Sequence, residues 1–107
     1  MERRCVPCEE GSVTPLSRGE AEKRLLEVPG WILADDAKSI RREFEFPNFV
    51  TAVDFVNTIT DIAEEEGHHP DLEVAWGKVV VTLSTHSIKG LSENDYIVAE
   101  RINALKK

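Results

Sequence analysis

Three histidines are the residues of this sequence best suited to proton transfer near neutral pH. His68 and His69 are adjacent, and His86 lies in the same third of the chain. Histidine is the side chain whose charge changes in this pH range, so it can both donate and accept a proton there. The acidic run Glu64–Glu66 ends the helix predicted just upstream, and its carboxylates and the negative helix end both favour a protonated imidazole ring. The sequence therefore predicts acid–base chemistry by histidine.

Two other interpretations of the histidines remain open. Three histidine ligands and one open position form a known catalytic zinc site, although the spacing here contains no helical i, i+4 pair. The histidines could equally be ordinary loop and strand-end residues. The pair Cys5 and Cys8 has a C-x-x-C spacing that suits half a zinc site, a redox pair or a disulfide. The sequence contains no second C-x-x-C. We therefore favour the interpretation that Cys5 and Cys8 are two thiols in an N-terminal arm that bind no metal.

Several further side chains have both a functional and a structural interpretation. Glu64 could orient a histidine or remain solvated, and Trp76 could stack on a flat heterocycle or pack in the core. Ser84 and Thr85 could donate hydrogen bonds to a ligand or lie on a solvated strand face. Asp95 follows Ser92 by three residues, which is the capping-box pattern of a helix N-terminus.

Hydrophobic spacing predicts three helices around these residues. The first begins with the capping pair Ser17 and Glu20 and ends before Pro29-Gly30. The second is capped by Asn48, ends at Gly67, and has its apolar residues at helical spacing: Phe49, Ala52, Val53, Val56, Ile59, Ile62 and Ala63. The third begins at Ser92, and its apolar face consists of Val98, Ala99, Ile102 and Leu105.

Four short strands complete the pattern. Strands are predicted at 31–33 and 40–46, with a turn at 35–38 between them, and at 72–76 and 78–85 around Gly77. Arg42 interrupts the apolar side of its strand, so that strand end is expected to be exposed. The predicted fold class is α+β, a four-stranded antiparallel sheet with three helices packed on one face, in the order α-β-β-α-β-β-α. Residues 1–15 are predicted to form a flexible arm, and 16–107 a single domain.

Length and charge restrict the function classes. The chain has 107 residues and a formal net charge of -7, which argues against direct binding to nucleic acid or to an anionic membrane. No apolar run reaches the length of a membrane helix, and no signal-peptide core is evident, so a cytoplasmic protein is expected. A core this small favours a pocket completed by a second subunit.

The order of these residues resembles the signature of the pterin-4a-carbinolamine dehydratases. Glu64 is followed by His68-His69-Pro70, Trp76, His86 and Asp95 at the family's spacings, and segments 83–86 and 90–95 are also similar. The resemblance covers about residues 16–105. It implies the same sheet and helices, assembly into homodimers or homotetramers, and loss of water from a 4a-hydroxytetrahydropterin to give the quinonoid dihydropterin. No metal or other cofactor is implied, and the product returns to pterin recycling.

The resemblance also assigns roles to residues. It implies that His68, His69 and His86 line the pterin site, with His68 and His86 near the 4a-hydroxyl and His69 near the ring. Glu64, Trp76, Ser84, Thr85 and Asp95 would then bind substrate or support the histidines. Gly67 and Leu72 depart from the residues of some members, which leaves efficiency and substrate preference open.

A role in binding another protein is the alternative function. Some members of the family act as dimerisation cofactors of a homeodomain transcription factor, and others have been linked to molybdenum cofactor metabolism. An exposed apolar helix face would favour such a role, and Phe49, Phe55 and Tyr96 are the candidates for it.

Overall fold

The structure, a computed structural model, describes residues 15–85, 88 and 90–105. Its elements are α1 (Arg18–Leu25), β1 (Ile32–Leu33), β2 (Ile40–Glu45), α2 (Phe49–Glu66), β3 (Asp71–Ala75), β4 (Lys78–Leu83) and α3 (Glu93–Asn103). The four strands form one antiparallel sheet in the order β1-β2-β4-β3. The fold class and the element order predicted from the sequence are therefore confirmed.

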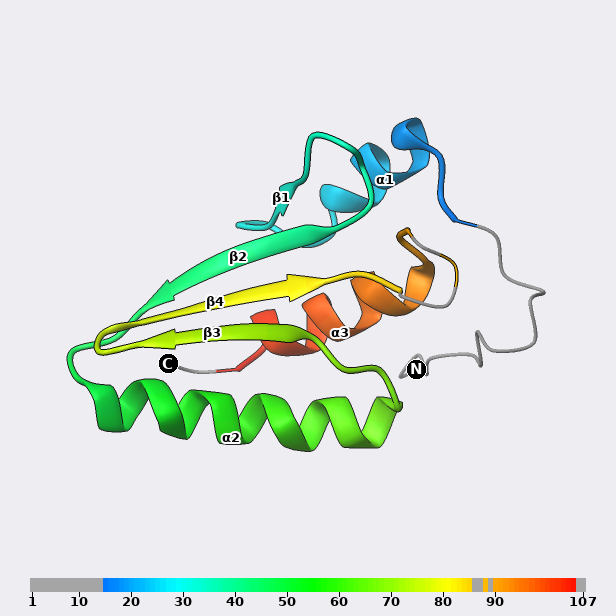
Figure 1. Ribbon diagram of the computed structural model, residues 1–107. Coiled ribbons are helices and arrows are strands. Elements are labelled where there is room, and N and C mark those ends of the chain that lie inside the picture. Colours follow the sequence, from blue (N-terminus) through cyan, green and yellow to red (C-terminus); the bar gives the residue numbers. More distant parts are fainter. Residues whose placement is uncertain (1–14, 86–87, 89, 106–107) are drawn as a thin grey trace.

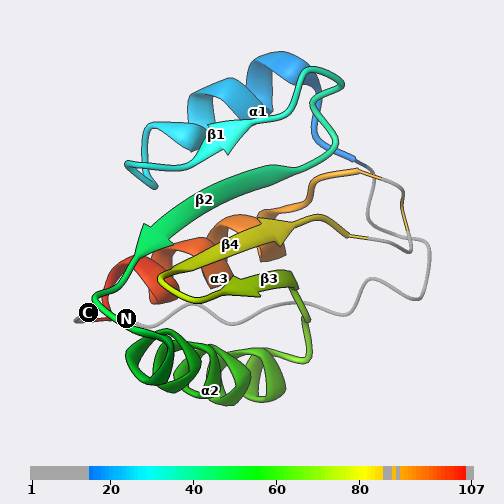
Figure 2. The same ribbon diagram turned by 60° about the vertical axis from the view of Figure 1, so that its left-hand side comes forward.

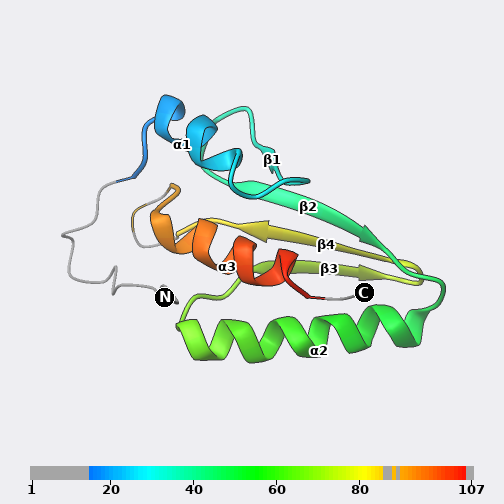
Figure 3. The same ribbon diagram turned by 180° about the vertical axis from the view of Figure 1, so that it is seen from behind.

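The helices cover one face of the sheet. Figure 3 shows α3 in front of β4 and β3, with α2 along the β3 side and α1 beside β1. Figure 2 shows the sheet twisting between α1 and α2. The other face carries mostly polar side chains, because alternate residues of a strand point to opposite sides. On β2, for example, Arg41, Glu43 and Glu45 are exposed while Ile40 and Phe44 are buried.

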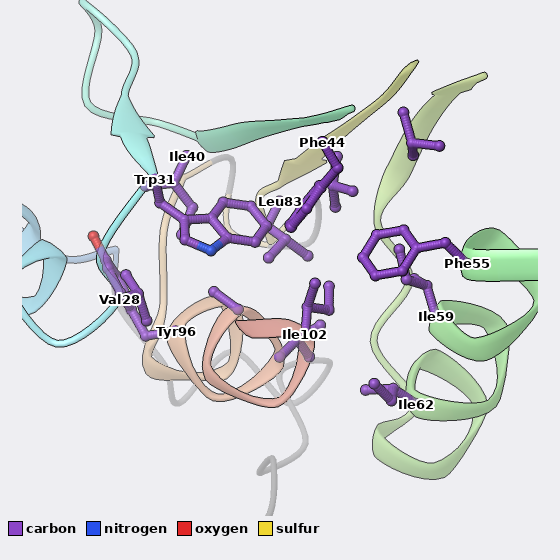
Figure 4. Packing of buried hydrophobic residues seen from close by; sticks show 14 of the residues in the cluster. Val28, Trp31, Ile40, Phe44, Phe55, Ile59, Ile62, Leu83, Tyr96 and Ile102 are labelled. Carbon is purple, nitrogen blue, oxygen red and sulfur yellow. The ribbon is translucent and has the colours of Figure 1, made fainter. Parts of the chain in front are cut away.

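The core lies between the sheet and the helices. Ile40 and Phe44 of β2 and Leu83 of β4 face Tyr96 and Ile102 of α3 (Figure 4). Phe55 of α2 packs on Phe44 with a ring-centroid separation of 4.7 Å and on Phe46 at 5.1 Å. The apolar stripe of α2 is thereby held against the sheet, and this packing fixes the line along which the helix runs toward its C-terminus.

Local capping sets the start of each helix, and the end of α2, where the sequence predicts them, whereas α1 already ends at Leu25 and α3 ends at Asn103, before Leu105. Ser17 and Glu20 form a complete capping box on α1, and Ser92 and Asp95 form another on α3. The Asn48 side chain accepts from the Thr51 amide at the start of α2, at 2.9 Å. Each of these contacts satisfies a backbone donor that the first turn of a helix leaves without a partner.

The expectation that Arg42 marks an exposed strand end is wrong. Its Nη1 donates to Asn103 Oδ1 of α3 at 2.7 Å, and its guanidinium lies 4.6 Å from the centroid of the Phe44 ring. Trp31 Nε1 donates to the same Asn103 oxygen at 2.8 Å. Gly30, at φ +92°, lies against this guanidinium, and a Cβ there would lie 2.9 Å from its carbon. A partner on a distant helix thus brings a charged side chain onto the core side of β2.

Two of the three residues expected on an exposed apolar helix face are buried. Phe55 is part of the contact between α2 and the sheet, and Tyr96 is fully buried under α1. Phe49 is half exposed, as expected. Within the described ranges, no helix combines the length and the apolar character that crossing a membrane would need.

Replacing Ala37 by glycine is expected to stabilise the fold by up to about 0.5 kcal/mol, after the loss of its buried methyl group is counted. Ala37 lies in the β1–β2 turn at φ 59°, and among the described non-glycine residues it alone has a positive φ. Glycine adopts this conformation without the Cβ strain, which exceeds the backbone entropy it adds to the unfolded chain. Urea unfolding would measure the gain. Ala34→Gly in the same turn is the control and should destabilise, and equal effects of the two substitutions would contradict the interpretation.

Candidate active site

The C-terminus of α2 turns sharply at Gly67 and places His68 beside α3. Gly67 has a left-handed conformation with φ 63°, which glycine adopts without a side-chain penalty. The amides of Gly67 and His68 both donate to the Ala63 carbonyl, the latter at 3.1 Å. In Figure 1 the end of α2, the start of α3 and the end of β4 lie at the same end of the molecule.

Arg101 of α3 ties down the last turn of α2. Its Nη1 donates to Glu66 Oε2 at 2.7 Å, and its Nη2 donates to Glu65 Oε1 at 2.8 Å. These hydrogen bonds, first that with Glu65 and then that with Glu66, raise the pKa of Arg101. The Glu66 side chain is almost fully buried, so this pair holds α2 to α3 close to the histidines.

His68 forms a short contact with a fully buried carboxylate. Its Nε2 lies 2.6 Å from Asp95 Oδ1, and the side chains of His68 and Asp95 are 11% and 0% exposed. An ionised carboxylate only accepts hydrogen bonds, so the ring donates from Nε2. This leaves Nδ1 as the nitrogen of His68 that can exchange a proton with another molecule. Asp95 therefore fixes both the orientation and the tautomer of the ring.

Asp95 is itself held by the start of α3 and by Thr85, which lies two residues after the end of β4. Its Oδ2 accepts from the Ser92 amide at 3.0 Å and from Thr85 Oγ1 at 2.8 Å. The Thr85 and Ser92 hydroxyl oxygens are 2.8 Å apart, and both residues are buried. Ser92 was predicted only as a helix cap, although the same capping box with Asp95 brings it to the site.

His69 forms a second pair, which faces solvent. Its Nε2 lies 2.7 Å from Glu64 Oε2, and both side chains are more than half exposed. An exposed pair of this kind contributes little to stability, typically below about 1 kcal/mol. Glu64 thus contacts His69, whereas Asp95 contacts His68, and the two adjacent histidines differ in how firmly their rings are held.

The structure does not bring all the predicted site residues together. Trp76 is exposed in the β3–β4 turn, and the length of β3 separates it from His68 by roughly 17 Å along the strand. Ser84 is half-buried between β4 and Thr85. His86, Cys5 and Cys8 lie outside the described residues. Within 15–85, 88 and 90–105, no three side chains of His, Cys, Asp or Glu are grouped so that they could hold a metal ion.

Tyr96 anchors α3 next to Asp95, and its buried hydroxyl should make the stability of the protein depend on pH in alkaline solution. Its hydroxyl donates to the Ala21 carbonyl at 2.8 Å, and burial, with the Asp95 charge, raises its pKa to about 12. Above pH 10 the unfolded chain loses this proton before the folded protein does, so stability falls as the pH rises from about 10 to 12. Below that window the contribution is complete.

Tyr96→Phe should cost about 1 kcal/mol at neutral pH, because one buried hydrogen bond is lost. The same variant should also show an alkaline decline that is shallower by about 1–2 kcal/mol between pH 10 and 12. Urea unfolding across this pH range measures both effects. Parallel declines for the variant and the wild type would contradict the assignment to Tyr96.

Comparison with known proteins identifies the family of this chain. The sequence model of the family described as pterin 4 alpha carbinolamine dehydratase matches residues 14–105. A relative from Halorhodospira halophila is 47% identical over 97% of this chain and 94% of its own length. One from Methylococcus capsulatus is 45% identical over 96% and 90%, and both are named as candidate pterin-4-alpha-carbinolamine dehydratases. The chain belongs to the pterin-4a-carbinolamine dehydratase family.

Solved structures show the same fold. A transcriptional coactivator/pterin dehydratase from Brucella melitensis matches with a TM-score of 0.80 and 36% identity, over 85% of this chain and 97% of that one. A pterin dehydratase-like protein identified as a RuBisCO assembly factor in the alpha-carboxysome matches with a TM-score of 0.61 and 20% identity, over 73% and 90%. At that identity the second match supports the fold alone.

Proposed function

We propose that this protein is a dehydratase that removes water from a 4a-hydroxytetrahydropterin and releases the quinonoid dihydropterin. The observation that carries the proposal is the contact of His68 with buried Asp95, which leaves a single ring nitrogen available for proton exchange. The family membership supports the substrate class. The pathway served would be the recycling of pterin cofactor after hydroxylation reactions.

The proposed reaction needs one acid and one base and changes no oxidation state. The N5 lone pair forms a double bond to C4a while the C4a–O bond breaks, and the leaving hydroxyl takes a proton and departs as water. The N5 proton passes to a base, so the acid loses one proton, the base gains one, and the reaction takes up and releases no net proton. General acid–base catalysis of this kind gives roughly 10²–10⁴ in rate.

In this proposal His68 acts at the 4a-hydroxyl through Nδ1, and His69 acts near the ring. Asp95 stabilises the positive charge on the His68 ring while its proton is available for transfer. Glu64 orients the His69 ring through its contact with Nε2, although this pair is exposed to solvent. A role for His86 at the 4a-hydroxyl rests on the resemblance in sequence, since that residue lies outside the described ranges.

The test is dehydration of freshly generated 4a-hydroxytetrahydropterin, followed by absorbance with and without the protein. The expected result is an acceleration that is proportional to protein concentration and disappears after heat denaturation. A folded protein that leaves the uncatalysed rate unchanged would refute the dehydratase function. Stoichiometric zinc in the purified protein would instead favour a zinc hydrolase.

Binding to another protein, or to further copies of this chain, is the second candidate function. Phe49 and Val50, at the start of α2, are 50% and 67% exposed, and Trp76 is 69% exposed. Exposed apolar side chains of this size are typical of interaction surfaces when they are contiguous. Light scattering would show whether the chain forms the expected homodimer or homotetramer, and a monomer would contradict that expectation.

A further inference from the structure

Thr85 is buried and contacts the candidate site through Asp95. It is 3% exposed, and both hydrogen bonds of its hydroxyl described above are to protein atoms, Asp95 Oδ2 and Ser92 Oγ. Its backbone is fixed as well, because its amide donates to the Gly90 carbonyl at 2.8 Å. The Thr85 hydroxyl therefore donates within the fold, to Asp95, and not to a ligand.

The direction of each hydrogen bond around Thr85 follows from the number of protons present. Thr85 has one hydroxyl proton, which it donates to Asp95. The contact between the two hydroxyls must then use the Ser92 proton, with Thr85 accepting. Ser92 also accepts from the Asn94 amide at 3.2 Å. The donors thus run in one direction, from Ser92 through Thr85 to the carboxylate.

This ordered chain ends on the carboxylate that holds His68. Asp95 Oδ2 receives Thr85 and the Ser92 amide, which leaves Oδ1 directed at His68 Nε2. Hydrogen bonds in such a chain polarise and strengthen one another in a buried environment. Without the Thr85 proton, Asp95 would keep only one donor on Oδ2 and could rotate away from the ring.

We propose that the Thr85 hydroxyl is a positioning group that, with Ser92, orients the Asp95 carboxylate and thereby holds His68 with Nδ1 free. The assignment rests on the proposed dehydratase function for its effect on rate, whereas its effect on the His68 ring does not depend on that function. Thr85 acts through Asp95 and is not itself a catalytic residue.

The test compares Thr85→Val, which keeps the shape but removes the hydroxyl, with Thr85→Ser, which keeps the hydroxyl. The first readout is the NMR signal of the His68 Nε2 proton, assigned by its absence in His68→Ala and recorded without substrate. In Thr85→Val this signal should move upfield and exchange faster with water, and Thr85→Ser should restore it. The second readout is kcat, which should fall roughly tenfold to a hundredfold in Thr85→Val with little change in KM, since a hydrogen bond to a charged group is lost.

Tyr96→Phe is the matched control. It also removes one buried hydroxyl at the start of α3, but that hydroxyl bonds to Ala21 and not to Asp95. It should leave the His68 signal and kcat unchanged while lowering thermal stability. The proposal is overturned if Thr85→Val keeps the wild-type His68 signal, or if Tyr96→Phe alters the signal and kcat as much as Thr85→Val does. A wild-type protein without dehydratase activity would count against the proposed function alone, because the NMR comparison would still be decisive.

Discussion

Replacing His68 by alanine is expected to lower the rate of 4a-hydroxytetrahydropterin dehydration by roughly 10²–10⁴, the range of general acid–base catalysis. Of the two histidines that the structure describes, His68 is the one whose ring is held by a buried carboxylate, and in the proposed mechanism its Nδ1 acts on the leaving hydroxyl. Asp95→Asn should lower the rate as well, because the amide cannot stabilise a charged ring. Initial rates at saturating substrate, measured beside circular dichroism spectra, would check both.

Two comparisons separate chemistry from folding in this experiment. Thr58→Ala on α2 removes a hydroxyl that donates to the Asp54 carbonyl of its own helix, and it should keep the wild-type rate. Imidazole added to His68→Ala should restore part of the rate if the missing group is a proton donor or acceptor. A folded His68→Ala protein with full activity would exclude His68 from the proton transfer. The loss for His69→Ala should be smaller, because Glu64 and His69 are both exposed.

Replacing Phe44 by alanine should cost about 3–5 kcal/mol, the range observed for removal of a buried aromatic ring. Phe44 is 3% exposed. Its ring packs edge-on against Trp31, with the ring centroids 6.5 Å apart, and it also packs against Phe55. Small domains are typically stable by about 5–15 kcal/mol, so the variant should be close to unfolding at 37 °C. Urea unfolding at 15 °C would measure the difference in the free energy of unfolding, provided that this free energy depends on urea concentration with the same slope in both proteins.

Phe49→Ala is the comparison for this prediction. Phe49 is the first residue of α2 and is half exposed, so its replacement should change stability by less than about 1 kcal/mol. If Phe44→Ala cost no more than Phe49→Ala, the contact between β2 and α2 would not hold the sheet and helix together as described.

The helices, their starts and the end of α2 were predictable because the signals that set them are local. Ser17 with Glu20 and Ser92 with Asp95 lie three residues apart, and Gly67 ends α2 through its own conformation. Alternation of apolar residues likewise predicted the strands, since one face of the sheet is buried.

Contacts between distant segments could not be predicted from spacing. Arg42 donates to Asn103, which lies 61 residues away in the sequence. The residues that neighbour Arg42 in the sequence do not indicate that a polar partner lies on the core side of its strand. The resemblance placed Trp76 among the residues that bind substrate or support the histidines, yet the length of β3 separates it from His68. The contact between His68 and Asp95 spans 27 residues. Spacing alone left Asp95 as a helix cap, whereas the resemblance implied its place near the histidines.

The two histidine pairs should respond differently to ionic strength. In about 0.15 M salt, charges in water are screened over roughly 8 Å, whereas buried pairs are screened much less. Mobile ions reach His69 and Glu64 freely but have little access to His68 and none to Asp95. The buried pair also lies where the negative C-terminus of α2 meets the positive N-terminus of α3. The end of α2 therefore favours a positive charge on His68, and the start of α3 stabilises the Asp95 carboxylate. Salt would therefore loosen one histidine and leave its neighbour in place.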